Sequence, residues 1–188
     1  RVTDIISEEP ATRINQTEYT QPLLLTVSHA LTSVLEQEGI TPDVTAGLSL
    51  GEYSALVEAG VLDFKDALKL VAKRGQYMQE AVVEGEGKMV AVLGLEDNVI
   101  EDICREVSTP EALVVPSNYN TPGQLVIGGH AQAVDAASEK CLEAGAKRAV
   151  PLVVSGPFHT PLMEAAKVRF APEMEVAELK ESKCPVLS

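Results

Sequence analysis

A short turn between two glycines most strongly constrains how this chain can fold. The segment Gly47-Leu48-Ser49-Leu50-Gly51 lies at the end of a stretch, 43–47, that is typical of a short buried strand, and it precedes a helical pattern that runs to Val57. Glycines allow the backbone to turn tightly because they carry no Cβ. The motif therefore predicts an α/β protein in which Ser49 is exposed where a strand turns into a helix.

The same turn gives Ser49 the setting of a nucleophile. In a G-x-S-x-G turn the serine hydroxyl projects at the end of the strand and next to the N-terminus of the helix. The helix dipole there stabilises developing negative charge, and we expect the N–H of Leu50 to be one donor of an oxyanion hole. Because the bare motif also occurs by chance, a glycine-serine turn without chemistry is the alternative.

Ser49 requires a general base, and His159 is the best candidate among the three histidines. It lies in a Gly-Pro-rich turn, 156–161, and constrained loops of this kind often position catalytic side chains. His29 lies within a predicted helix and His130 at the start of another, where structural or surface roles are more common. No acid is clearly placed to orient His159, so a backbone carbonyl is the expected acceptor for one ring nitrogen.

A cation within an apolar helical pattern is the third candidate. Arg74 lies between Val71 and Met78 in a helix predicted to begin at Asp63. An arginine in this position is either solvated together with Lys73 or paired with an anion. If it meets an anion, its guanidinium would select a substrate with a free carboxylate, because the two groups form a bidentate pair.

The composition excludes several classes of function. The 188 residues include 15 basic and 28 acidic side chains, for a formal net charge of −13, which argues against binding to a nucleic-acid backbone or to anionic lipid. No apolar run approaches the ~20 residues of a membrane span. The three cysteines are far apart and form no C-x-x-C pair, so we expect no metal site, no disulfide and a reducing cytoplasmic location.

The central part of the chain follows a different pattern from its flanks. Strand and helix patterns alternate there as β-α-β-β-α-β, the split arrangement of ferredoxin-like domains. We predict an α/β catalytic domain formed by residues 1–87 and 156–188, and a ferredoxin-like subdomain formed by residues 88–155. Within the subdomain a turn is predicted over 118–123. The first helix is predicted to begin with Thr20 as its cap, after an irregular segment.

Taken together, several segments resemble a known enzyme family. In chain order they are Tyr19-Thr20-Gln21-Pro22, Gly47 to Leu56, Arg74-Gly75 with Met78, Asn118 to Gln124, Gly145-Ala146-Lys147-Arg148 and Ser155-Gly156-Pro157-Phe158-His159. They are similar in order and spacing to the malonyl-CoA:acyl carrier protein transacylases, an acyltransferase family of bacterial type II fatty-acid synthesis. The resemblance covers nearly the whole chain, and the combination of motifs is highly specific although no single motif is.

The resemblance implies a fold and a set of site residues. The fold is an α/β-hydrolase-like large domain with an inserted ferredoxin-like subdomain. Ser49 resembles the family's nucleophile, His159 its general base and acid, and Arg74 the partner of the malonyl carboxylate. The positions that resemble substrate-binding residues are Gln21, Met78, Asn118 and Phe158.

The activity that the resemblance implies is transfer of a malonyl group from malonyl-CoA to the phosphopantetheine thiol of acyl carrier protein. The reaction would be ping-pong, through a malonyl-serine intermediate, without a cofactor or a metal. Malonyl-CoA and acyl carrier protein are therefore the expected partners of an expected monomer. Two alternatives stay open: a serine thioesterase or esterase, and a non-catalytic fragment of the acyltransferase.

Two features of the family have no counterpart in this chain. The family begins with a strand and a Gly-Gln-Gly-type loop that supplies a second oxyanion donor, and residues 1–19 do not match it. The family also continues past Ser188, in a part that supplies the carbonyl orienting the histidine. We therefore expect the chain to be truncated at both ends.

Overall fold

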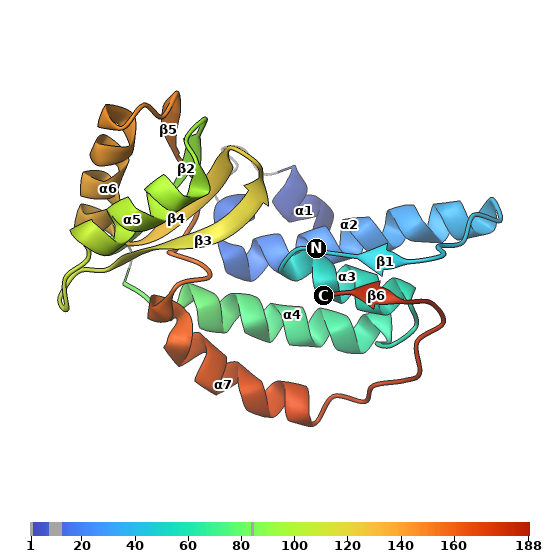
Figure 1. The fold of residues 1–188 in the computed structure, drawn as a ribbon. Helices are drawn as coiled ribbons and strands as arrows, with labels where there is room; N and C mark the ends of the chain where they lie inside the picture. Colours follow the sequence, from blue (N-terminus) through green and yellow to red (C-terminus); the bar gives the residue numbers. More distant parts are fainter. Residues whose placement is uncertain (1, 8–12, 84) are drawn as a thin grey trace. The chain divides into compact units, whose positions relative to one another are not determined.

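The computed structural model describes residues 2–7, 13–83 and 85–188 (Figure 1). The chain forms two compact units, one made of residues 1–77 with 168–188 and the other of residues 78–167. Both units combine helices with strands, which confirms the predicted α/β class at this level. The predicted subdomain, 88–155, lies inside the second unit.

The first unit is built mainly from helices. Its elements are α1 (Val2–Ile6), a 3₁₀ turn (Arg13–Asn15), α2 (Thr17–Gln37), β1 (Thr45–Ala46), α3 (Leu50–Glu58), most of α4 (Phe64–Gln79), most of α7 (Glu164–Glu175, preceded by the 3₁₀ turn Pro161–Met163) and β6 (Val186–Leu187). Strands β1 and β6 pair in parallel, with Thr45 opposite Val186. Apolar residues at helical spacing on α4 contribute Ala67, Leu70 and Val71 to the core of this unit. Leu25 and Leu62 complete the buried cluster.

Helix α2 begins earlier than the sequence predicts. It starts at Thr17 rather than at Thr20, and Gln16 occupies the cap position. The Thr20 hydroxyl donates to the backbone carbonyl of Gln16 from inside the first turn, so it does not cap the helix. The prediction of an irregular segment before this helix is also wrong in part, because that segment contains α1 and the 3₁₀ turn Arg13–Asn15. At the other end of the helix, Gly39 follows the C-cap with a φ of 76°.

The second unit contains a four-stranded antiparallel sheet. Its strands are β2 (Gly87–Leu93), β3 (Val114–Thr121), β4 (Gln124–His130) and β5 (Arg148–Pro151), in the order β3-β4-β2-β5. Helix α5 (Asp97–Val107) joins β2 to β3, and α6 (Ala131–Glu143) joins β4 to β5. Both helices cover one face of the sheet (Figure 1). The succession of elements along the chain is therefore β-α-β-β-α-β.

Strand β2 contributes side chains to two hydrophobic clusters on opposite faces of this sheet. Val90 and Val92 join the cluster beneath α5 and α6, whereas Met89 and Ala91 lie in a second cluster, against which Phe158 packs. This alternation follows from the two-residue period of a strand. The second cluster fixes one side of the turn that carries His159.

The predicted turn over 118–123 is wrong for its first four residues. Strand β3 continues to Thr121, and Asn118 pairs with Val126 on β4. The asparagines favour turns locally, but cross-strand pairing outweighs that preference, and irregularities in the register accommodate them. The turn itself is confined to Pro122 and Gly123. Asn118 is therefore a strand residue.

Candidate active site

The backbone at Ser49 adopts a conformation that is rare for a residue with a side chain. Ser49 has a φ of 56° and a ψ of −108° and occupies the N-cap position of α3. Such a conformation costs about 1–3 kcal/mol and concentrates at functional sites. Strand β1 ends at Ala46 and α3 begins at Leu50, so the strand turns into the helix within three residues. This is the predicted sharp turn with a serine at its apex.

The two glycines of the motif have different roles. A Cβ on Gly47 would lie 2.0 Å from the carbonyl carbon of Gly51 and 2.4 Å from the nitrogen of Glu52. The close approach of the strand end to α3 therefore requires glycine at position 47. A Cβ on Gly51 would meet nothing within 4 Å, so the expectation that both glycines avoid a clash is right only for Gly47.

The Arg74 guanidinium lies directly against the Ser49 hydroxyl. Its Nη2 donates to Ser49 Oγ at 3.0 Å, and its Nη1 donates to Gln21 Oε1 at 2.6 Å. The guanidinium carbon also lies 5.7 Å from the centre of the Tyr53 ring, a distance at which the ring face attracts a cation. Of the two alternatives for Arg74, a solvated side chain is thus excluded, because three groups of the first unit hold it.

Burial shapes the electrostatics around Ser49. It lowers the pKa of the half-buried Arg74, while Tyr53 and Glu52 act in the opposite direction. Burial also raises the pKa of Tyr53, against the influence of Arg74. An arginine stays protonated even so, and Tyr53 stays neutral near pH 7. A fixed positive charge therefore lies beside the hydroxyl of Ser49 and can hold an anionic group there.

The start of α3 carries the N–H group that the sequence predicts as an oxyanion donor. Leu50 is the first residue of the helix, and the first N–H groups of a helix have no intrahelical acceptor. The positive end of the helix dipole lies at the same place. The Leu50 N–H is therefore suitably located to donate to an oxygen that becomes negative next to Ser49.

The predicted base, His159, lies in a turn of the second unit. It has a φ of 57° and an exposed side chain. Among the residues that the structure describes, His159 and Ser49 are the two non-glycine residues with a positive φ. The turn is held by a hydrogen bond from Thr160 Oγ1 to the Pro157 carbonyl at 2.6 Å and by the packing of Phe158 on the sheet.

The predicted site residues divide between the two units. The first unit brings together Ser49, Leu50, Arg74 and Gln21. The second unit holds Met78, in the last turn of α4, Asn118, on β3, and Phe158 with His159 in the turn before α7. Asn118 Oδ1 accepts a hydrogen bond from Ser117 Oγ at 3.1 Å.

The other two histidines have structural surroundings. The His29 ring stacks on Phe64, with ring centres 4.2 Å apart. His130 Nδ1 accepts a hydrogen bond from the backbone N–H of Leu113 at 3.0 Å. Both arrangements agree with the structural roles expected from the sequence.

Two residues that contact the site were missed by the sequence analysis. Thr17 Oγ1 accepts a hydrogen bond from Gln21 Nε2 at 2.8 Å, and Tyr53 lies under the Arg74 guanidinium. Thr17 and Gln21 are four positions apart on one helix, a spacing at which side chains meet. The spacing predicts the contact between Thr17 and Gln21 only if the helix already includes Thr17, whereas the sequence predicted a start at Thr20.

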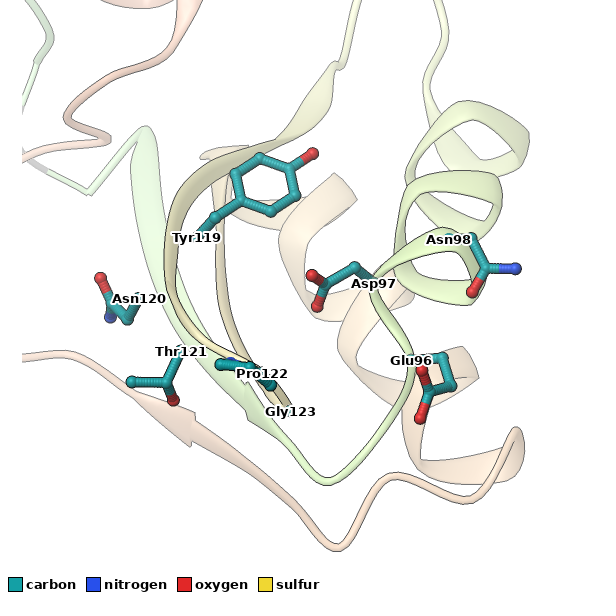
Figure 2. Close-up of a pocket in the computed structure, with 8 residues that line it drawn as sticks. All are labelled: Glu96, Asp97, Asn98, Tyr119, Asn120, Thr121, Pro122 and Gly123. Carbon is teal, nitrogen blue, oxygen red and sulfur yellow. The ribbon is translucent and has the colours of Figure 1, made fainter.

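A separate cleft lies in the second unit, between the tip of the β3-β4 hairpin and the start of α5 (Figure 2). Asp97 points toward the hairpin, whereas Asn98 points away from it (Figure 2). The Tyr119 hydroxyl at its edge donates to Glu101 at 2.8 Å. The lining contains neither a histidine nor a nucleophile paired with a base; it consists of Glu96, Asp97, Asn98, Tyr119, Asn120, Thr121, Pro122 and Gly123.

Two other kinds of feature were sought in the described part of the chain. Over residues 2–7, 13–83 and 85–188, no group of three or more histidine, cysteine, aspartate or glutamate side chains is arranged to hold a metal ion. Over the same ranges, none of the helices combines the length and the apolar character that crossing a bilayer demands.

Comparison with known proteins decides the family. The model of the acyl transferase domain matches residues 1–187. The chain belongs to the acyl transferase domain family. The predicted resemblance to an acyltransferase family is thereby confirmed.

Two curated relatives of this acyl transferase domain carry the same name. The malonyl CoA-acyl carrier protein transacylase of Bacillus subtilis is 46% identical over 188 residues, which is 100% of this chain and 59% of the relative. The protein of the same name from Escherichia coli K12 is 48% identical over 185 residues, 98% of this chain and 60% of the relative. The chain thus spans about 60% of the length of these curated relatives.

A solved structure matches the fold closely. It contains a malonyl-transacylase in complex with a type II PKS acyl-carrier protein; the TM-score is 0.95 at 45% identity, over 100% of this chain and 60% of that chain. The predicted thioesterase or esterase alternative has no counterpart among the three relatives described here, which are all named as transacylases.

The two glycines of the turn provide a matched pair of substitutions in this acyl transferase domain. We expect Gly47→Ala to lower the free energy of unfolding by about 3 kcal/mol or more, because its Cβ would overlap the backbone of Gly51. Gly51→Ala should change it by less than about 1 kcal/mol. Urea unfolding measures both values. Labelling of Ser49 by a fluorophosphonate should be lost in Gly47→Ala and kept in Gly51→Ala; equal behaviour of the two variants would contradict the different roles.

Proposed function

We propose that this chain carries the nucleophile and the carboxylate-binding group of a malonyl-CoA:acyl carrier protein S-malonyltransferase. The contact that supports this most is the one between the Arg74 guanidinium and Ser49 Oγ, at 3.0 Å. A nucleophilic hydroxyl beside a fixed cation favours an acyl donor whose acyl group carries an anion, because the cation can bind that anion while the hydroxyl attacks. Malonyl-CoA is such a donor, because its acyl group carries a free carboxylate one carbon away from the thioester carbonyl.

Arg74 would bind the malonyl carboxylate. A guanidinium and a carboxylate form two parallel, charge-assisted hydrogen bonds, and the half-buried position of Arg74 strengthens them. In the absence of substrate, one of the donors is directed at Ser49 Oγ. Binding of the carboxylate would take over this donor and leave the Ser49 hydroxyl available to the base. Gln21 would keep the guanidinium in place during the exchange.

The first half-reaction forms the malonyl-serine. His159 accepts the Ser49 proton as Oγ attacks the thioester carbonyl, and the Leu50 N–H donates to the oxyanion. The carbon–sulfur bond then breaks, and the CoA sulfur leaves as a thiol with the proton that His159 returns. The second half-reaction reverses this route: the phosphopantetheine thiol of acyl carrier protein attacks the malonyl-serine and releases Ser49. The resemblance assigns Met78, Asn118 and Phe158 to binding of the acyl group.

The finer description of the fold belongs to the same proposal. The strand order β3-β4-β2-β5 with two helices on one face supports a ferredoxin-like subdomain at 88–155. The turn at Ser49 supports an α/β-hydrolase-like arrangement for 1–87 with 156–188. The subdomain would then be an insertion within the larger domain, and His159 would belong to the segment that follows the insertion.

The proposed partners are malonyl-CoA and acyl carrier protein, with no cofactor, metal, nucleic acid or membrane involved. The complex of a related malonyl-transacylase with its acyl-carrier protein supports the second partner. A formal net charge of −13 would repel an acidic carrier at long range, so docking would depend on a local basic surface. We propose a cytoplasmic monomer.

The nucleophile is tested by intact mass spectrometry after brief mixing with malonyl-CoA. We expect a malonyl adduct that disappears in Ser49→Ala, because the adduct is an ester of the Ser49 hydroxyl. Circular dichroism of both proteins controls for folding. An undiminished adduct in folded Ser49→Ala would rule out Ser49 as the nucleophile, and an adduct that passes to water but not to a pantetheine thiol would favour the esterase alternative.

The role of Arg74 is tested by comparing two acyl donors. In Arg74→Ala, kcat/KM for Ser49 acylation by malonyl-CoA should fall about 10- to 100-fold relative to acetyl-CoA, because a charge-assisted pair is lost only for malonyl. Stopped-flow or quench-flow mass spectrometry gives both rate constants. Lys73→Ala is a matched control: Lys73 precedes Arg74 but pairs with Glu173, so the ratio should not change. An equal loss for both donors in Arg74→Ala would contradict the assignment.

A further inference from the structure

We propose that Thr17 is a positioning residue that sets the preference for acyl groups with a free carboxylate. It would act through Gln21 on Arg74, without touching the substrate. The proposal rests on the proposed function, because it assigns to Thr17 a part in the selectivity of that site.

A continuous line of hydrogen bonds joins Thr17 to the nucleophile. Gln21 Nε2 donates to Thr17 Oγ1 at 2.8 Å, Arg74 Nη1 donates to Gln21 Oε1 at 2.6 Å, and Arg74 Nη2 donates to Ser49 Oγ at 3.0 Å. Thr17 and Gln21 are 6% and 4% exposed. Water therefore cannot easily replace a hydrogen-bond partner that either side chain loses. Leaving a buried polar group without a partner costs free energy.

The chemistry of the three groups fixes which way the Gln21 amide points. A guanidinium has only donors, so it must face the carbonyl oxygen of the amide. The NH₂ group of Gln21 then faces Thr17, whose hydroxyl oxygen accepts. If position 17 had no acceptor, the NH₂ group would lose this partner, and the Gln21 side chain would be held less firmly against Arg74. Thr17 thus supports the amide orientation that Arg74 requires, because its hydroxyl oxygen accepts from the NH₂ group.

The backbone anchors Thr17 next to Arg74. A Cβ on Gly75 would lie 2.7 Å from the carbonyl oxygen of Thr17 and 2.9 Å from Cα of Glu18. The first turn of α2 therefore lies against α4 at the residue that follows Arg74. This contact is independent of the side-chain hydrogen bonds and keeps the distance between the two helices fixed. A small change at Thr17 would consequently be felt at the guanidinium rather than absorbed by movement of the helices.

Selectivity would depend on this alignment because a bidentate pair is directional. Both guanidinium donors must lie in the plane of the carboxylate for two parallel hydrogen bonds. A guanidinium that turns more freely keeps its charge but loses that geometry. Acylation by malonyl-CoA would therefore suffer more than acylation by acetyl-CoA, which has no carboxylate.

The test compares Thr17→Val with Thr17→Ser. Valine has nearly the shape of threonine but no acceptor, whereas serine keeps the hydroxyl. We expect the malonyl-to-acetyl ratio of kcat/KM for Ser49 acylation to fall about 5- to 10-fold in Thr17→Val, as for loss of one buried hydrogen bond, and to stay near the starting value in Thr17→Ser. Thr26→Val is the matched control, because the Thr26 hydroxyl donates to the backbone carbonyl of Pro22 on the same helix.

The ratio separates positioning from general loss of structure, because misfolding lowers both rates together. An unchanged ratio in folded Thr17→Val, or an equal fall in Thr26→Val, would overturn the proposal. If Thr17→Val does not fold, Thr17→Cys replaces it, since sulfur is a weak acceptor, and the ratio should fall below the parent and Thr17→Ser values, by less than the fall expected for valine. A ratio equal to that of the parent would then overturn the proposal.

A second readout distinguishes failure of this proposal from failure of the proposed function. Nitrogen-15 NMR of the Arg74 guanidinium measures its rotation without substrate. Rotation should be slow in the parent and in Thr17→Ser, and at least several-fold faster in Thr17→Val. If the parent forms no Ser49-dependent malonyl adduct, the proposed function fails, whereas the NMR result still decides whether Thr17 positions Arg74. Equal rotation rates in all three proteins would overturn the positioning role.

Discussion

The short distance between the end of β1 and the start of α3 is the constraint on which the site depends. Gly47 allows this approach, since any Cβ there would overlap the backbone of Gly51. The turn forces Ser49 into a positive φ, and the strain is offset by the packing of α3 in the first unit. Because the turn is so tight, the hydroxyl of Ser49 and the first N–H of α3 lie at one place. The nucleophile and an oxyanion donor therefore follow from a single feature of the backbone.

Arg74 adds selectivity to this arrangement. The chain is strongly acidic overall, yet a half-buried cation lies against the hydroxyl of Ser49. Its charge is held by an amide oxygen and an aromatic ring, neither of which neutralises it. A carboxylate partner in the protein would have cancelled the charge. The use of Gln21 and Tyr53 leaves Arg74 able to bind an anion from outside, which is what a malonyl group requires.

The sequence predicted the site better where the signal was local. The turn at Ser49 depends on residues within one motif, and the succession of strands and helices in the second unit follows local patterns. The extension of β3 over 118–121 was missed because pairing with β4 overrides the turn preference of asparagine. Thr17 was missed for a similar reason: its role depends on where α2 begins and on its packing against Gly75 of α4. Contacts between distant segments are not encoded in any one motif.

Arg74 is proposed to exchange Ser49 Oγ for the carboxylate of the acyl group. A crystal structure of the protein with malonyl-Ser49 trapped in place would show this exchange. We expect two parallel hydrogen bonds from the guanidinium of Arg74 to the malonyl carboxylate, at about 2.7–2.9 Å, with Gln21 still bound to Nη1. A malonyl-Ser49 whose carboxylate faces solvent, with Arg74 still directed at the oxygen of Ser49, would contradict it.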